Sequence, residues 1–332
     1  MKKMLTKKIP LYIILILFAF LGILFCFFFP IQTPASDFSS EPTASNCNLN
    51  IRRLTGYSFI KPLVYAEQET GNPDYLTVKS AAQRLLDSKK AQGLITDGSI
   101  YYREFSGGKW FGINERVSYS PGSLLKVPEL IAFYKMKERI PGLFEKKYLF
   151  NQEYKTDRNL HFVSKKLEVG KTYSIRDFLE YMIVHSDNQA TIVLSSLIDN
   201  QLFSNVFTDI GFPSPDFKSK DYPMNARDYS RFFIELFNAS YLNFEDSENC
   251  LRLLSKAVFK EGMMKGIPDG IPVCHKFGES GPETEPHFSE AGLVLNGNKP
   301  YLLVVMLKGK DLTKMPAVSS EISSLIYQRL GQ

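Results

Sequence analysis

The sequence predicts an α+β fold, in which one sheet is built from both ends of the folded region and a helical lobe is inserted between them. Strand-like runs occur at residues 99–114 and again at 271–307, whereas residues 123 to about 265 are mostly helical by pattern. Helical patterns at 75–92 and 317–330 flank the strands. Because a sheet buries its apolar face against helices, this order of elements favours one sheet with helices between and outside its strands.

The first thirty residues differ from the rest of this 332-residue chain. Four lysines precede Pro10, and residues 11–29 then run for nineteen residues without a charge. As a helix this run spans about 28 Å, close to the ~30 Å hydrocarbon core of a bilayer. A cleaved signal has a shorter apolar stretch that ends at a small-residue site. We therefore expect residues 1–29 to be an uncleaved, single-pass anchor in the cell membrane, with the lysines cytoplasmic and the remainder extracytoplasmic.

The segment after this anchor, residues 30–50, is rich in Pro, Ser, Thr and Asn and is expected to be a linker to a folded domain at 51–332. Without the four N-terminal lysines the formal net charge falls from +5 to +1. That balance gives no electrostatic case for binding nucleic acid. Three cysteines lie beyond the anchor: Cys47, Cys250 and Cys274. Their spacing leaves open whether two of them form a disulfide or all three stay free thiols.

The first elements of the folded domain are a helix and a hairpin. Residues 75–92 contain good helix formers and stop at Gly93. Two strand-like runs, 99–105 and 109–114, are joined by Ser-Gly-Gly, which indicates a hairpin.

The helical lobe and the C-terminal strands follow. Ser174 and Asn225 each stand where a cap is expected, directly before an apolar helical run. Strand character then returns in three runs, at 271–277, 290–295 and 301–307. The final helix, about 317–330, carries its apolar residues on one face.

Three short motifs occur in a fixed order along the chain: Ser123-Leu-Leu-Lys126, Ser186-Asp-Asn188 and Lys276-Phe-Gly278. A chain of this length contains an S-x-x-K or a K-x-G about once by chance, so neither carries weight alone. Their positions in the predicted structure are stronger evidence, since the first motif lies at a helix start, the second in a turn between helices, and the third at a strand end.

The residue types of these motifs suit nucleophilic catalysis. Positions i and i+3 share one face of a helix, so Lys126 can bring its amine near the Ser123 hydroxyl. A serine hydroxyl needs a neighbouring base, and a lysine serves as one only when its pKa falls. Burial and a second cation, which Lys276 can supply, both lower that pKa. The N–H groups at the helix start also favour the negative charge that develops on the attacked carbonyl.

Each motif also has a structural reading. Ser123 can be a helix cap whose neighbours form core, Ser186-Asp-Asn188 can be ordinary turn chemistry, and Lys276 can be a solvated charge at a strand end. Taken jointly, with their order and settings, the motifs favour the catalytic reading.

In this combination the chain resembles the class A β-lactamases and penicillin-binding proteins, which carry S-x-x-K, S-D-N and K-T-G in the same order. The likeness extends to Asn114-Glu115, to the Leu-Leu-Lys-Val-Pro run, and to Glu290–Leu295 followed by Tyr301–Val305, and it covers roughly residues 75–332. The resemblance implies an antiparallel sheet with flanking helices and an inserted all-helical lobe at about 123–265.

The resemblance also implies roles for the catalytic residues. Ser123 would be the acylated nucleophile, Lys126 its base, and Ser186 the relay that protonates the leaving nitrogen.

The remaining motif residues would bind substrate. Asn188 would hold the side-chain amide and Lys276 the carboxylate, and Gly278 and Glu279 would also contact the substrate. The backbone N–H groups of Ser123 and Glu279 would form the oxyanion hole.

Two departures from the family pattern stand out. The usual K-T-G is Lys-Phe-Gly here, so Phe277 removes a hydroxyl. The family's deacylating glutamate, in an E-x-x-L-N loop after S-D-N, has no counterpart, because residues 189–228 contain no glutamate. Three nearby aspartates could take its place, but none lies in a sequence that matches the family's E-x-x-L-N loop: Asp209, Asp216 and Asp221. Loss of such a base slows release of the acyl group by about 10²–10⁴.

Other chemistries lack support. The four histidines show no paired spacing typical of a metal site: His161, His185, His275 and His287. No nucleotide-binding glycine motif is present either, so neither a metal nor a cofactor is expected. We expect His185, beside the S-D-N turn, to be a packed neighbour of the site.

The sequence thus predicts a bacterial, membrane-anchored serine hydrolase that forms an acyl-enzyme on Ser123. Three hypotheses stay open: a β-lactamase with weak deacylation, a D-Ala-D-Ala peptidase or transpeptidase that acts on peptidoglycan stem peptides, and a non-catalytic envelope-binding module. The oligomeric state does not follow from the sequence.

Overall fold

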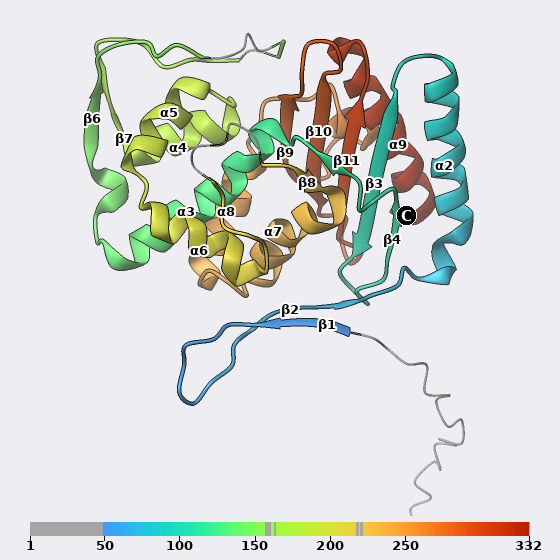
Figure 1. The fold of residues 1–332 in the computed structure, drawn as a ribbon, viewed down its shortest axis with the longest axis horizontal. Helices are drawn as coiled ribbons and strands as arrows, with labels where there is room; N and C mark the ends of the chain where they lie inside the picture. The colour runs from blue at the N-terminus through green and yellow to red at the C-terminus, as the bar shows by residue number, and fades with distance from the viewer. Residues whose placement is uncertain (1–48, 157–160, 163, 217–218, 220–221, 332) are drawn as a thin grey trace, which may run out of the picture. The chain divides into compact units, whose positions relative to one another are not determined.

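A five-stranded antiparallel sheet forms the centre of the fold (Figure 1), in the order β4-β3-β11-β10-β9. The computed structural model describes residues 49–156, 161–162, 164–216, 219 and 222–331. The sheet strands are β3 (Asp97–Glu104), β4 (Trp110–Ile113), β9 (Val273–Ser280), β10 (His287–Val294) and β11 (Tyr301–Lys308). The sheet therefore combines strands from both ends of the folded region, which confirms the fold that the sequence predicts.

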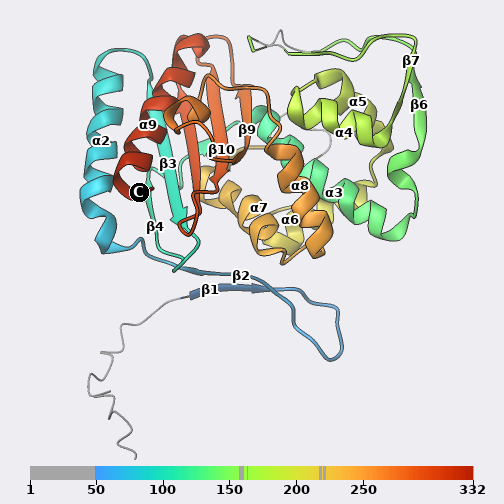
Figure 2. The same cartoon turned by 180° about the vertical axis from the view of Figure 1, so that it is seen from behind.

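Two helices cover one face of the sheet, α2 (Leu76–Ala91) and α9 (Met315–Leu330), and both views show them side by side (Figures 1 and 2). Leu86 of α2 and Ile322 of α9 are fully buried in the apolar cluster beneath them. Burial of large apolar side chains of this kind contributes about 1.5–3 kcal/mol each. The two helices that the sequence pattern predicts are confirmed, with ends shifted by one or two residues.

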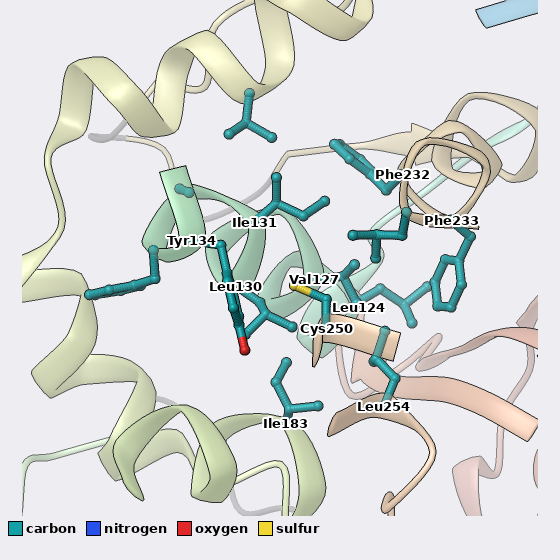
Figure 3. Packing of buried hydrophobic residues seen from close by; sticks show 14 of the residues in the cluster. Leu124, Val127, Leu130, Ile131, Tyr134, Ile183, Phe232, Phe233, Cys250 and Leu254 are labelled. Carbon is teal, nitrogen blue, oxygen red and sulfur yellow. The ribbon is translucent and has the colours of Figure 1, made fainter. Parts of the chain in front are cut away.

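The helical lobe lies against the opposite face of the sheet. Its helices are α3 (Lys126–Arg139), α4 (Ile175–Val184), α5 (Asn188–Leu197), α6 (Asn200–Ile210), α7 (Ala226–Asn238) and α8 (Phe244–Leu254). Short 3-10 turns lie in or beside the lobe at Gly122–Leu125 and Leu143–Glu145, and elsewhere at Pro73–Tyr75, Met263–Gly266 and Leu312–Lys314. Helix α3 runs through its middle, and Figure 3 shows Leu124, Val127 and Leu130 surrounded by side chains of neighbouring helices. This core fixes the start of α3, where the first motif lies.

The expectation that the lobe is entirely helical is wrong in detail. The strands β6 (Lys147–Phe150) and β7 (Lys171–Ser174) pair as an antiparallel ribbon, and β5 (Ser118–Tyr119) pairs with β8 (Met224–Asn225). These strands have two to four residues, too few to show a period of two in the sequence.

The caps predicted at Ser174 and Asn225 are confirmed. The Ser174 hydroxyl accepts the N–H of Asp177 while the Asp177 carboxylate accepts the N–H of Ser174, a complete capping box. The Asn225 side chain accepts the N–H of Asp228 at 2.7 Å.

A hairpin of β1 (Leu49–Arg53) and β2 (Leu63–Gln68) precedes α2. It was absent from the sequence prediction, and it takes Leu49 and Asn50 from the predicted linker into the folded unit, which spans Asn48–Gln332.

Two further expectations concern the cysteines and the membrane. Cys250 and Cys274 are buried free thiols, whereas Cys47 lies outside the described residues. The predicted span at 11–29 also lies outside them. Within the part of the chain that the structure describes, no helix has both the length and the apolar content needed to cross a bilayer.

Candidate active site

Ser123 lies in the 3-10 turn Gly122–Leu125, directly before α3. The turn is fixed from below, because Leu124 is fully buried and the Tyr229 hydroxyl donates to the Leu124 carbonyl at 2.8 Å. Ser123 itself is only partly buried. Its hydroxyl thus stands on a rigid support and remains accessible to a substrate.

The chain just before the turn is tied to the sheet. The Ser280 hydroxyl donates to the Ser120 carbonyl, and the Ser120 N–H donates to Nδ1 of His287 at 3.1 Å. Both partners come from the paired ends of β9 and β10. The nucleophile turn is therefore held at a fixed position beside the edge strand β9.

The glycine of the third motif is required by this close approach. A Cβ added at Gly278 would lie 2.9 Å from the Ser123 nitrogen and closer still to the Pro121 carbonyl. Gly122 has a φ of +56°, and a Cβ there would collide with the Glu279 carbonyl. The two glycines let the backbones of the turn and of β9 meet, as an oxyanion hole built from the N–H groups of Ser123 and Glu279 requires.

Two lysines converge on the hydroxyl of Ser186. Lys126 Nζ lies 3.4 Å from Ser186 Oγ and donates to the Ser186 carbonyl at 2.8 Å. Lys276 Nζ donates to the same Oγ at 2.8 Å and to the Phe277 carbonyl at 2.7 Å. Ser186 has a φ of +56°, a strained backbone that directs its side chain between the two amines. The structure thus brings the three motifs together.

Burial changes the protonation of both amines. Lys126 is 4% exposed, and desolvation lowers its pKa to about 8 although the nearby Glu129, Asp187 and Glu279 carboxylates raise it. Desolvation, with the positive charge of Lys126, lowers the pKa of Lys276 well below its usual range. With a pKa of about 8, roughly a tenth of Lys126 is neutral at pH 7, far more than for an exposed lysine, and this neutral form is the one that can act as a general base.

Asn188 and Asp187 position the second motif. The Asn188 Oδ1 accepts from Lys126 Nζ at 2.9 Å, which leaves the amide NH₂ to donate to a substrate carbonyl. The buried Asp187 carboxylate accepts the N–H groups of Gln189 and Leu167, both at 2.9 Å. The turn is therefore rigid before any substrate binds.

Glu129 is a buried carboxyl group that the sequence interpretation missed. It follows Lys126 by one turn of α3 and accepts a hydrogen bond from Ser195 of α5 at 3.1 Å. Desolvation raises its pKa to about 7, although the Ser195 hydrogen bond and the charge of Lys126 lower it. The i, i+3 spacing was the available signal, since it places Glu129 on the face of Lys126.

The side chain of Glu279 also connects two parts of the fold, in addition to the role expected for its backbone N–H. Its carboxylate, 1% exposed, accepts the N–H groups of His161 and Phe162, each at 3.0 Å. It thus holds part of the segment between β6 and β7 against the end of β9. No sequence signal pairs these positions, since they are 118 and 117 residues apart.

At the Lys-Phe-Gly departure, the Phe277 side chain belongs to an aromatic cluster. The Phe277 ring stacks on Phe259 with centroids 4.0 Å apart, and Phe162 meets both rings edge-on. Lys276 Nζ lies 4.5 Å from the Phe277 ring centre. The aromatic side chain therefore builds one wall of the site beside the second lysine.

The histidines and acids are dispersed. His275 pairs with the buried Glu290 at 3.1 Å, and His185 contacts the Ser164 hydroxyl at 2.8 Å. Among the described residues, no group of three or more His, Cys, Asp or Glu side chains could hold a metal ion.

This fold, with a serine on a supported turn beside a buried lysine of lowered pKa, defines the class of serine hydrolases that work through nucleophilic attack. Its family follows from the sequence comparison. A model of the beta-lactamase enzyme family matches residues 77–330, and the chain belongs to that family. It is a serine hydrolase of the β-lactamase type. No match is found among curated proteins.

Several solved structures share the fold. A β-lactamase from Sphaerobacter thermophilus superposes with a TM-score of 0.65 at 19% identity, over 76% of this chain and 97% of the other. PBP-A gives 0.61 at 19% identity, over 75% and 95%. A class A β-lactamase from Mycobacterium abscessus gives 0.63 at 15% identity, over 76% and 100%. At these identities the likeness concerns the fold alone.

Proposed function

We propose that Ser123 forms an acyl-enzyme with β-lactam-type amides and that the acyl group is released slowly. The observation that supports this most directly is the hydrogen-bonded series from Lys126 through Ser186 to Lys276, beside the turn that carries Ser123. These groups supply both proton transfers that acylation of a serine by an amide requires.

In the first step, neutral Lys126 takes the proton of the Ser123 hydroxyl while the oxygen attacks the carbonyl carbon. The carbonyl oxygen becomes an oxyanion, which the N–H groups of Ser123 and Glu279 stabilise. A single donor of this kind typically contributes about 10²–10³ in rate.

In the second step, the C–N bond breaks and the leaving nitrogen takes a proton. Ser186 Oγ donates it and is reprotonated by the lysines that contact it. The net change moves the serine proton to the leaving amine, so no other reactant is needed.

Slow release is inferred from the acids around the site. Residues 189–228 contain no glutamate. The Asp209 carboxylate accepts the Tyr241 hydroxyl at 2.8 Å and so has a packing partner in the lobe. Asp221 lies outside the described residues. Because residues 189–228 supply no glutamate for the hydrolytic water and Asp209 is already hydrogen-bonded, the acyl-enzyme is expected to persist.

A second candidate is a D-Ala-D-Ala peptidase or transpeptidase that penicillin traps. It is favoured by the same lack of a deacylating glutamate, and one solved structure with this fold is an acyl-enzyme complex of a PBP-A mutant with penicillin G. Both candidates use Ser123 in the same way and differ in the lifetime of the adduct.

For location, we propose that residues 1–29 anchor the chain in the cell membrane and that the catalytic domain lies on its extracytoplasmic side. The support is the charge-free run at 11–29 behind four lysines.

The test is to incubate the full chain in detergent with a labelled penicillin and follow the adduct by intact mass. Rapid labelling with rapid loss supports a β-lactamase, and a persistent adduct supports the trapped peptidase. Ser123→Ala must abolish any adduct seen. No adduct on Ser123 would exclude both enzymes and leave the non-catalytic module.

A further inference from the structure

A pocket of about 470 Å³ opens beside the site, on the side of Phe277. Its size is within the range of small-molecule sites, about 300–1,000 Å³. Its walls come from the segment between β6 and β7 (His161, Phe162 and Ser164), from His185 at the end of α4, from residues 258–261 after α8, and from Phe277 of β9.

This pocket adjoins the pair of groups that would protonate the leaving nitrogen. Phe277 lines it, and the ring of Phe277 lies 4.5 Å from Lys276 Nζ. His185 also lines it and directly precedes Ser186, whose hydroxyl contacts Lys276 at 2.8 Å. Ser186 and Lys276 do not themselves line the pocket, but each directly adjoins in the chain a residue that does, so a leaving group that extends past Ser186 Oγ would come next to it.

The lining suits an uncharged, flat group. Phe259 and Phe277 are stacked and almost fully buried, and Phe162 closes the cluster with its centroid 5.0 Å from that of Phe259. The opposite wall is His185 with Ser164, and burial, with the charge of Lys165, lowers the pKa of His185. Aromatic walls favour an aromatic ligand group, because it buries a large apolar area and can stack on the rings or meet them edge-on.

The same surroundings are poorly suited to a carboxylate. Lys276 is 1% exposed, and its amine already contacts the Ser186 hydroxyl, the Phe277 carbonyl and the Phe277 ring. Two of the three N–H groups of its ammonium form are thus already used, and a carboxylate would compete with the Phe277 ring for the third. The hydroxyl of the usual K-T-G is absent at Phe277, and the exposed Lys260 and Glu261 carry opposite charges.

We propose that this pocket holds the leaving group of the acyl donor, and that it selects an aromatic or bulky apolar leaving group over a terminal D-alanine. The inference rests on the proposed function. The reaction is unchanged: the Ser123 oxygen bonds to the carbonyl carbon, the bond to the leaving atom breaks, and the serine proton ends on the leaving group.

The experiment compares two thioesters with the same N-acetyl-D-alanyl group. One releases benzyl mercaptan and the other releases mercaptoacetate, so the two leaving groups differ in that one carries an aromatic ring where the other carries a carboxylate. Ser123 acylation of the full chain in detergent is followed by intact mass and by thiol release. We expect the benzyl thioester to acylate about ten- to a hundredfold faster, the gain that burial of an aromatic group allows.

Two variants locate the preference in the pocket. Phe259→Ala removes a wall, and Val258→Trp fills the pocket from a side chain that is 43% exposed and so disturbs the core little. Each should lower the ratio of the two rates toward one. The control is Phe244→Ala, since Phe244 is 82% exposed and outside the pocket, and it should keep the wild-type ratio.

Equal rates for both thioesters in the wild type, or a ratio that Val258→Trp leaves unchanged, would overturn the pocket assignment while Ser123 still becomes acylated. The absence of any adduct with the thioesters and with penicillin would instead overturn the proposed function, and with it this inference.

Discussion

Lys126 and Glu129 lie one turn apart on α3, both buried, and their pKa values are shifted toward each other, to about 8 and about 7. Burial shifts both pKa values strongly, and strongly shifted pKa values are concentrated at functional sites. The Glu129 carboxylate stabilises the ammonium form of Lys126, so it works against the neutral form that acylation needs. The pair therefore sets the pH at which Ser123 becomes reactive.

Glu129→Gln should shift the pH profile of acylation to lower pH. Acylation requires neutral Lys126, so its rate rises with pH through the pKa of that lysine. Removal of the carboxylate removes a charge that raises this pKa, which we expect to fall by about one unit. The measurement is the rate of Ser123 labelling by penicillin from pH 5.5 to 9.5.

The matched control is Glu138→Gln, because Glu138 lies on the same helix and pairs with Lys135 at the surface. Its profile should coincide with the wild type. An unchanged profile for Glu129→Gln would mean that Glu129 serves only in packing.

At this scale the motif residues were predictable and their supporting contacts were not. Lys126, Ser186 and Lys276 meet as their motifs suggest, and the backbone nitrogen of Ser123 lies against Gly278 of the third motif. The contact of Glu279 with the backbone at 161–162 depends on how two distant segments pack, which spacing along the chain does not encode.

Among the elements, β2 is held to the sheet and to α7 by one buried carboxylate. Glu67 accepts from Arg227 at 3.0 and 3.1 Å, from the Tyr101 hydroxyl, and from Arg103 at 3.4 Å. Arg227 also lies over the Trp110 ring at 4.2 Å. All of these side chains are buried, so the charges depend on each other for compensation.

Glu67→Gln should destabilise the folded domain. It leaves two buried guanidinium groups without their counter-charge, a change that typically costs about 3–5 kcal/mol. Chemical denaturation of the full chain in detergent, followed by Trp110 fluorescence, measures it. Glu69→Gln is the control, since Glu69 is 43% exposed and lies 4.0 Å from Arg227, and it should cost much less. Equal losses for the two variants would contradict the buried cluster as the source of stability.

Elements were predictable in proportion to their length and regularity. Helices α2 and α9 have sixteen residues each, and their patterns located them within two residues. The pairs β6–β7 and β5–β8 depend on tertiary contacts with the lobe and have no local signature. The strands of the β1–β2 hairpin are joined by a long loop without a tight-turn signal, so nothing in the local sequence predicts that they pair.

In the whole molecule, the site exists because distant parts of the chain meet. The turn with Ser123 belongs to the inserted lobe, whereas Lys276 and Gly278 belong to the C-terminal part of the sheet. The order of strands and helices was enough to predict this architecture, because few arrangements bury such a series of elements. The order does not encode the close contact between the turn and β9, which the glycines at 122 and 278 permit.

The proposed membrane location rests on residues 1–29, outside the segment that carries the proposed catalytic groups, so anchoring and acylation should be separable. Removal of residues 1–29 should release the chain from the membrane fraction and leave the rate of Ser123 labelling by penicillin unchanged, because every group proposed to act on the substrate lies between 123 and 279. Fractionation of cells that express each form, followed by labelling of both fractions, measures the two properties. A control that replaces the four lysines by glutamine should keep the chain in the membrane, since the apolar run supplies the insertion energy and the lysines its orientation. A shortened chain that stays in the membrane fraction would place the anchor elsewhere, and one that leaves it but no longer labels would show that the catalytic domain depends on the N-terminal segment.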